Sequence, residues 1–168
     1  ASRAEHEADA LVLEGACVPY GEANVWWPVA DAIRSALGAP VGTPSATLRT
    51  HCRAWVELAL PAAGEQQREL VTEGLLHLLG EHSTLAGIDP GRAREEVSRS
   101  VVSVVEGLAS QRPVVVVLSD VHWADDAVLS LGATLMERCA HLPVVILATL
   151  LTTDGQDLAV TVTTAPPA

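Results

Sequence analysis

The hydrophobic pattern of the chain is dominated by one uninterrupted apolar run, four valines and a leucine at residues 114–118. The run is too short for a lone helix and lacks the alternation of a half-buried strand. It therefore predicts a strand covered on both faces, as in a parallel sheet packed between helices. Pro113 stands at the start of this strand, where its missing N–H does least harm. Ser119 and Asp120 follow the run, at the edge where open α/β sheets bind ligands.

Three further segments predict strands. Residues 10–13 form a short apolar run that ends at Glu14 and Gly15. Residues 144–148 form a second run, which ends in Thr149. Residues 158–163 alternate apolar and β-branched polar positions, which is typical of a strand.

Helical signals fill most of the segment between the first two strands. The periodicity and the helix-breaking residues predict helices over residues 24–38, 45–60, 65–79 and 89–110, and another over 126–140. Strands that alternate with helices predict an α/β fold with a mainly parallel sheet. About a hundred residues between two neighbouring strands exceed a single crossover, so a cluster of helices, at about residues 26–110, is inserted there.

Several residues within these helices have predicted local roles. Asn24 is the expected N-cap of the first helix, and Gly38 is its expected C-terminal glycine. Asp125 is expected to cap the helix that begins at Asp126. Trp26 is expected to anchor its loop to the core rather than to stack on a base. In the third helix, leucines are expected to crowd one side: Leu70, Leu75, Leu76, Leu78 and Leu79.

Composition and charge narrow the classes of function. The formal net charge is −11, and the ten basic residues are all arginine and are scattered. Nucleic-acid binding needs clustered Lys and Arg, so a direct nucleic-acid contact is not expected. Three widely spaced cysteines, Cys17, Cys52 and Cys139, indicate reduced thiols in a cytoplasmic protein. The histidines lack metal-ligand spacing, and no apolar stretch reaches the roughly 18 residues of a membrane span.

The apolar strand and the residues after it carry a family resemblance. Ser119-Asp120-Val121-His122-Trp123-Ala124-Asp125 is similar to the Walker B segment of the STAND class of P-loop NTPases. The resemblance is closest to the ATP-binding modules of large LuxR-type transcriptional regulators and to those beside bacterial nucleotidyl cyclase domains. Residues 12–22 with Trp27-Pro28 resemble the second strand of that family, and residues 143–149 resemble its fourth strand. The likeness spans about residues 5 to 150.

The resemblance also implies an architecture. The family has a three-layer helix–sheet–helix fold, and residues 1–168 would form a single, partial domain of it. The Walker B-like strand and helix correspond to residues 113–140, and residues 150–168 diverge from the family. If the chain follows this fold, the strand at residues 144–148, which corresponds to the family's fourth strand, has an exposed edge. We predict that residues 158–163 cover this edge, or that another chain does.

The resemblance implies ATP and Mg²⁺ as cofactors, and the sequence departs from the family at several of the residues concerned. The phosphate-binding pattern G-x-x-x-x-G-K-[ST] is absent, and the sequence contains no lysine. Ser119 replaces the first acid, which holds magnesium in the family. Asp120 keeps the second position and is the candidate catalytic base and metal contact. Ser119, Asp120 and Thr149 are the candidate nucleotide-binding residues, and Leu151 stands where the family often has arginine.

These features predict a truncated or degenerate ATP-binding signalling module of a cytoplasmic transcriptional regulator, without ATP hydrolysis on its own. Such a module would act through protein interaction, with missing domains of the same protein, with another protein chain or as a homo-oligomer. Contact with a membrane is not expected. One alternative is an active ATPase whose P-loop comes from a missing segment or a partner chain. Another is a different class of enzyme that uses His122 as a base beside Asp120 and Thr149.

Overall fold

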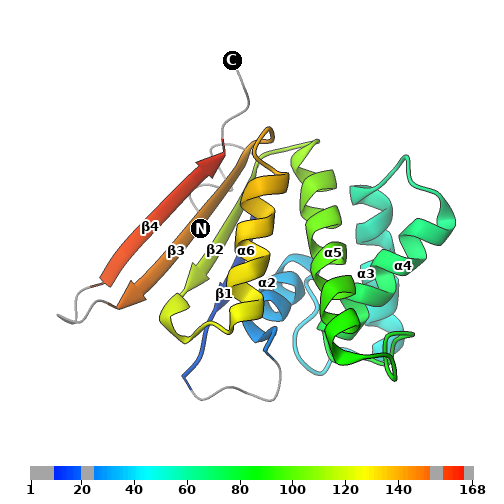
Figure 1. Cartoon of the computed structure of the whole chain (residues 1–168). Coiled ribbons are helices and arrows are strands. Elements are labelled where there is room, and N and C mark those ends of the chain that lie inside the picture. The colour runs from blue at the N-terminus through cyan, green and yellow to red at the C-terminus, as the bar shows by residue number, and fades with distance from the viewer. Residues whose placement is uncertain (1–9, 20–24, 152–156, 165–168) are drawn as a thin grey trace.

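The computed structural model describes residues 10–19, 25–151 and 157–164. Strands and helices alternate along the chain (Figure 1). In chain order the elements are β1 (Leu11–Ala16), α2 (Trp27–Leu37), α3 (Ser45–Ala59), α4 (Glu65–Leu78), α5 (Pro90–Ala109), β2 (Val114–Ser119), the 3-10 helix η1 (Val121–Trp123), α6 (Asp126–Arg138), β3 (Val144–Leu151) and β4 (Asp157–Thr164).

The four strands form one sheet in the order β1-β2-β3-β4. β1, β2 and β3 are parallel, with Leu13 opposite Val116 and Val116 opposite Ile146. β4 pairs antiparallel along the whole of β3. The structure thus confirms the α/β class, the mainly parallel sheet and the insertion of helices between the first two strands. It also confirms that residues 158–163 cover the edge of the Val144 strand.

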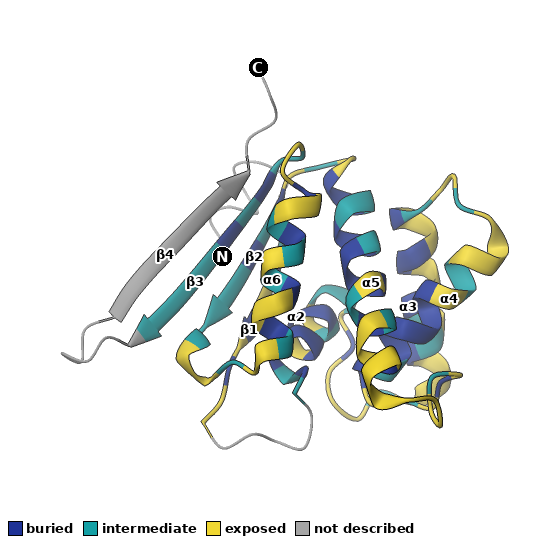
Figure 2. Cartoon of the chain, in the orientation of Figure 1, coloured by how far each residue is buried: buried dark blue, intermediate teal, exposed yellow. Residues whose placement is uncertain are grey.

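The helices of the described segments lie on one face of the sheet (Figures 1 and 2). Leu13, Val116 and Ile146 are buried on that face, where residues of α2, α3, α5 and α6 surround a small cavity of about 40 Å³. Both crossovers step across the sheet in the same direction, and right-handed crossovers of this kind place their helices on the same face. The described residues therefore form two layers; a helix on the second face, as the three-layer prediction requires, is not among them.

Glycine brings the first helix close to the sheet. A Cβ atom at Gly15 in β1 would lie 1.9 Å from the carbonyl oxygen of Pro28 in α2. Only a residue without a side chain allows this approach, so Gly15 fixes how closely the insertion packs on β1.

The core of the insertion is built from the predicted apolar positions, with one exception. The five apolar residues predicted for α5 are all buried: Val97, Val101, Val104, Val105 and Leu108. In α4 the buried face follows Val71, Leu75 and Leu78 at helical spacing, and Leu70 precedes this stripe. Leu70 is therefore 55% exposed, and its predicted place with the other leucines is wrong.

The helix ends agree with the predictions except at the start of α2. Trp26 is the N-cap of α2 and has no side-chain capping bond, while Asn24 lies outside the described residues. Gly38 ends α2 with a φ of 60°, as predicted. The Asp125 carboxylate accepts a hydrogen bond from the Ala127 N–H and caps α6. Within the described segments, none of the helices combines the length and the hydrophobicity that a membrane crossing would need.

Candidate functional site

Ser119 and Asp120 lie at the carboxyl end of β2, beside Thr149 of β3. Asp120 has φ 58° and ψ 41°, and it is the only residue other than glycine with a positive φ among those the structure describes. Its backbone N–H donates a hydrogen bond to Oγ1 of Thr149 over 3.2 Å. Its carbonyl accepts a bond from the Trp123 N–H at 2.9 Å. These two bonds hold the tight turn that leads from the sheet into η1.

Thr149 differs from its predicted position in one respect. The sequence predicts that it follows the end of its strand, whereas β3 continues to Leu151 and Thr149 is opposite Ala159 of β4. Pairing with β4 supplies backbone partners beyond the apolar run, and this extends the strand. The contact with Asp120 is nevertheless made, so the structure brings the three predicted site residues together.

The end of β1 contributes Cys17 to the same edge. The Cys17 N–H donates to the Ser119 carbonyl at 2.9 Å, which continues the β1–β2 ladder. Cys17 is buried, and burial raises the pKa of its thiol above the ordinary value of 9.0; the Asp120 carboxylate raises this pKa further. A thiol in such surroundings stays protonated and is a poor nucleophile or metal ligand at neutral pH.

His122 and Trp123 follow in η1. His122 is exposed, and its ring centroid lies 5.0 Å from that of the half-exposed Trp123. A ring contact at the surface accounts for both residues without a catalytic role. The assignment of His122 as a base stays a prediction.

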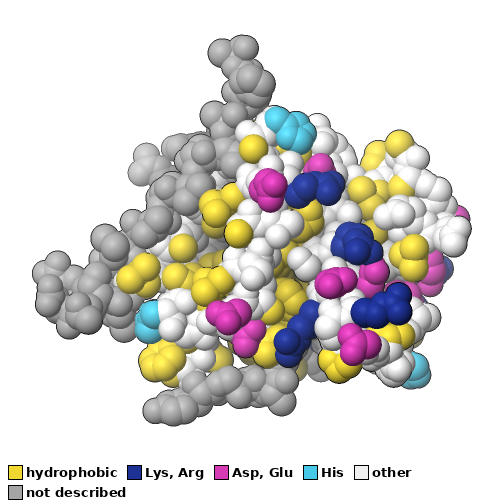
Figure 3. Space-filling view, in the orientation of Figure 1, with side chains coloured by type: hydrophobic (Ala, Val, Ile, Leu, Met, Phe, Trp, Pro, Cys, Tyr) yellow, Lys and Arg dark blue, Asp and Glu magenta, His cyan; other side chains and the backbone are white. Residues whose placement is uncertain are grey.

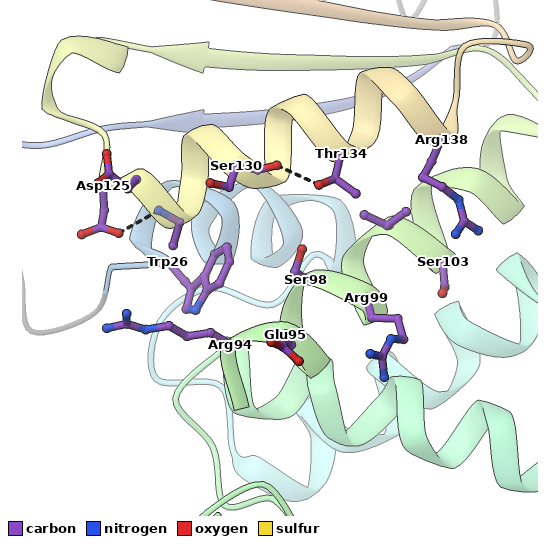
Figure 4. A pocket seen from close by; sticks show the side chains of 13 residues that line it. Trp26, Arg94, Glu95, Ser98, Arg99, Ser103, Asp125, Ser130, Thr134 and Arg138 are labelled. Atoms are coloured by element: carbon purple, nitrogen blue, oxygen red, sulfur yellow. Dashed lines mark hydrogen bonds between the residues drawn. The ribbon is translucent and has the colours of Figure 1, made fainter. Parts of the chain in front are cut away.

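A cavity of about 720 Å³ lies elsewhere, between α5 and α6 (Figure 4). Trp26 lies at one end, and at the other Arg138 of α6 and Glu106 of α5 form an ion pair of 2.9 Å. The ionisable side chains that line the cavity are three arginines and three acids: Arg94, Arg99, Arg138, Glu95, Asp125 and Asp126. No sequence pattern predicts this cavity, because the cavity depends on how closely α5 and α6 pack. The only signal is a set of short polar residues on both helices: Ser98, Ser103, Ser130 and Thr134.

A buried carboxylate forms a second polar cluster, within the insertion, which the sequence pattern does not predict either. Glu73 of α4 is only 5% exposed; Arg49 of α3 donates to its Oε1, and the Thr84 N–H donates to its Oε2 at 2.6 Å. Burial acts to raise the pKa of Glu73, but the bonds from Arg49 and Thr84 outweigh it, so this pKa lies below the ordinary value of 4.5. Every oxygen of this carboxylate is paired, so its role is to fasten the loop after α4.

Comparison with known families identifies the fold. The family model of the AAA ATPase domain matches residues 1–147. The chain belongs to the AAA ATPase domain family. No curated protein and no solved structure matches it.

Members of the AAA ATPase domain family in general bind a nucleotide and Mg²⁺. The described residues supply only some of the groups that such binding requires. Mg²⁺ prefers oxygen ligands, which Asp120, Ser119 and Thr149 carry. However, Asp120 is the only carboxylate among these three residues, and no group of three His, Cys, Asp or Glu side chains in the described segments could hold a metal ion.

The described residues are less suited to binding the phosphates of ATP. A helix N-terminus attracts phosphate through its free N–H groups, but α6 has Asp125 as its N-cap and Asp126 in its first turn. Asp125 uses its carboxylate to occupy one of these N–H groups. The described residues therefore do not fit a complete site for Mg²⁺ and ATP, and no hydrolytic step follows from them.

Proposed function

We propose that this AAA ATPase domain is a STAND-type signalling module of a cytoplasmic transcriptional regulator, which does not hydrolyse ATP by itself. Its work is interaction with further domains of the same protein or with another protein chain. One observation carries the proposal. The position that follows the β2 apolar run, where the resembled segment has its first acid, is Ser119, which leaves Asp120 with an uncharged neighbour.

The proposal has a simple electrostatic reason. Phosphoryl transfer depends on positioning and on positive charge around the phosphates, and a bridging Mg²⁺ needs carboxylates to hold it. The 168 residues contain no lysine, and the net charge is −11. Leu151 stands where the resembled pattern has arginine. Each of these features lowers the affinity for a triphosphate and the stabilisation of its transition state.

The geometry at Asp120 favours one alternative, an ATPase that is completed by a phosphate-binding loop from another segment or chain. Asp120 is held at the carboxyl edge of the sheet by the Thr149 hydroxyl. A carboxylate in this place is suited to orient a water molecule once a phosphate is supplied.

The experiment compares Mg²⁺-dependent ATP turnover and binding of a fluorescent ATP analogue by the 168-residue chain and by its Asp120→Asn variant. We expect turnover at the background rate in both. ATP turnover by the chain alone that Asp120→Asn lowers by about a hundredfold, a typical contribution of a general base, would overturn the proposal. Turnover that arises only when a P-loop-bearing partner is added, and that needs Asp120, would establish the alternative.

A further inference from the structure

The sheet and the helices enclose a small cavity of about 40 Å³ whose walls are hydrocarbon. Leu13, Val116 and Ile146 of the sheet lie on one side of it, and residues of α2, α3, α5 and α6 lie on the other. The lining side chains are those of alanine, valine, leucine and isoleucine, apart from Trp55 and the glycine Gly132. The indole N–H of Trp55 is thus the only polar side-chain group that the described lining residues carry.

Water and ions are poorly suited to this cavity. Its volume of about 40 Å³ exceeds the roughly 10–15 Å³ that one water molecule needs, so size does not exclude water. A buried water molecule makes about two to four hydrogen bonds, however, and a single N–H cannot supply them. None of the described lining residues is ionisable, so a charged ligand would lose its hydration without gaining a partner. The lining therefore selects an apolar ligand.

The volume limits the ligand to a few heavy atoms. An apolar cavity of roughly 150 Å³ binds benzene or xenon. The cavity beside the sheet, at about 40 Å³, is much smaller, too small for a benzene ring unless its walls move. Protein interiors are otherwise close-packed, and the atoms around a gap lose dispersion contacts on one side. A small apolar molecule would restore these contacts.

One side of the cavity comes close to solvent. The lining residues are buried except for Leu118 near the carboxyl end of β2 and Gly132 in the middle of α6, which are partly buried. A Cβ atom at Gly132 would meet no atom within 4 Å, so the wall is loosely packed there. Figure 3 shows hydrophobic side chains gathered at the surface beside α6, on the side toward β4. An apolar molecule thus has a short, apolar route to the cavity.

We propose that this cavity is a binding site for an uncharged, apolar molecule of a few heavy atoms, such as dioxygen, a noble gas or a short hydrocarbon. Its ligand contacts β2 at Val116, α6 at Leu131 and the helical insertion at Val104. Because these walls meet only while the insertion is packed on the sheet, the ligand binds that arrangement and stabilises it. None of the candidate site residues lines the cavity, so this inference does not rest on the proposed function.

The probe is xenon, a single apolar atom, and the readout is the shift of the methyl resonances of the 168-residue chain under xenon pressure. Val116→Ile adds one methyl group inside the cavity and leaves less room for a ligand. Val117→Ile is the matched control, because it makes the same change at the next position of β2, whose side chain lies on the opposite face of the sheet. Val104→Ile narrows the cavity from α5. Thermal unfolding followed by circular dichroism verifies that the variants are folded.

We expect xenon to shift the methyl resonances of the lining residues in the wild type and, with the same affinity, in Val117→Ile. Val116→Ile and Val104→Ile should each bind xenon at least about tenfold more weakly, because the ligand would overpack the filled cavity. Two filling variants keep the test decisive if one of them does not fold.

The inference is overturned if xenon shifts no lining methyl group in the wild type, or if the folded filling variants bind xenon as well as Val117→Ile does. It is equally overturned if nuclear Overhauser effects between water and the lining methyl groups place ordered water in the cavity. ATP turnover is not a readout here, so this inference and the proposed function fail separately.

Discussion

The backbone N–H of Asp120 and the hydroxyl of Thr149 are joined by a hydrogen bond of 3.2 Å between residues 29 positions apart in the chain. The bond links the end of β2 to the middle of β3, and it fixes a turn in which Asp120 has the left-handed backbone conformation. It is therefore the contact that assembles the candidate site.

Thr149→Val tests the worth of this contact. Valine preserves the shape and the strand preference of threonine but removes the acceptor, so the partly buried N–H of Asp120 loses its partner. We expect a loss of about 1 kcal/mol in the free energy of unfolding, measured by urea titration. Thr134→Val, which removes only a bond within α6, should cost clearly less. An equal effect of the two substitutions would contradict the role of Thr149.

Substitutions at Asp120 test the backbone conformation. A φ of 58° costs an ordinary side chain roughly 1 kcal/mol, and glycine avoids this cost. Asp120→Gly should therefore be more stable than Asp120→Ala by about 1 kcal/mol, in equilibrium unfolding of both variants. If alanine were as stable as glycine here, the turn would not have the left-handed conformation.

The approach of α2 to β1 predicts a large effect at one glycine and a small one at another. In Gly15→Ala the new Cβ would collide with the Pro28 carbonyl, which cannot move without its helix, so the expected loss is at least about 2 kcal/mol. Gly132→Ala adds a methyl group to open space inside α6 and should stabilise the chain by about 0.5–1 kcal/mol. Thermal unfolding of both variants measures the contrast; equal losses would exclude the close α2–β1 contact.

The features of the fold that the sequence could predict are those set by local patterns. The valine run forms a strand, Val97 and Val101 are buried on one face of a helix, and Asp125 caps α6, as short-range rules predict. The predicted cover on both faces of the valine strand is not found among the described residues, because their helices lie on one face and Val115 and Val117 are only partly buried. The sequence does not predict the exposed side chain of Leu70, because closely spaced leucines leave the direction of the buried face undetermined until α4 packs on α3 and α5.

The proximity of the candidate site residues could be predicted from the sequence, but their geometry could not. The carboxyl ends of parallel strands share an edge, so the meeting of Ser119, Asp120 and Thr149 follows from the order of the strands. The left-handed conformation of Asp120 depends on bonds to distant partners, which no local pattern specifies. The charge cluster at Glu73 could not be predicted for the same reason. Its partners Arg49 and Thr84 come from α3 and from the loop after α4, and no local pattern brings them together.

That cluster predicts how stability depends on pH. The pKa of Glu73 is lower in the folded chain than its ordinary value of 4.5. The stability that its ionised form contributes is therefore fully present above about pH 4.5 and is lost as the pH falls through the lower, folded pKa. Glu73→Gln removes this titration and leaves Arg49 without its partner, so we expect a loss of about 1–3 kcal/mol at pH 7 and a smaller loss, relative to the wild type, near pH 3.

The measurement is urea unfolding of wild type and variant between pH 3 and pH 7. Glu96→Gln is the matched control, because Glu96 is 40% exposed where it pairs with Arg99 on α5. An exposed pair of this kind contributes at most about 1 kcal/mol, and the control should parallel the wild type throughout. If Glu73→Gln and Glu96→Gln gave the same pH profile, the buried carboxylate would not fasten the loop after α4.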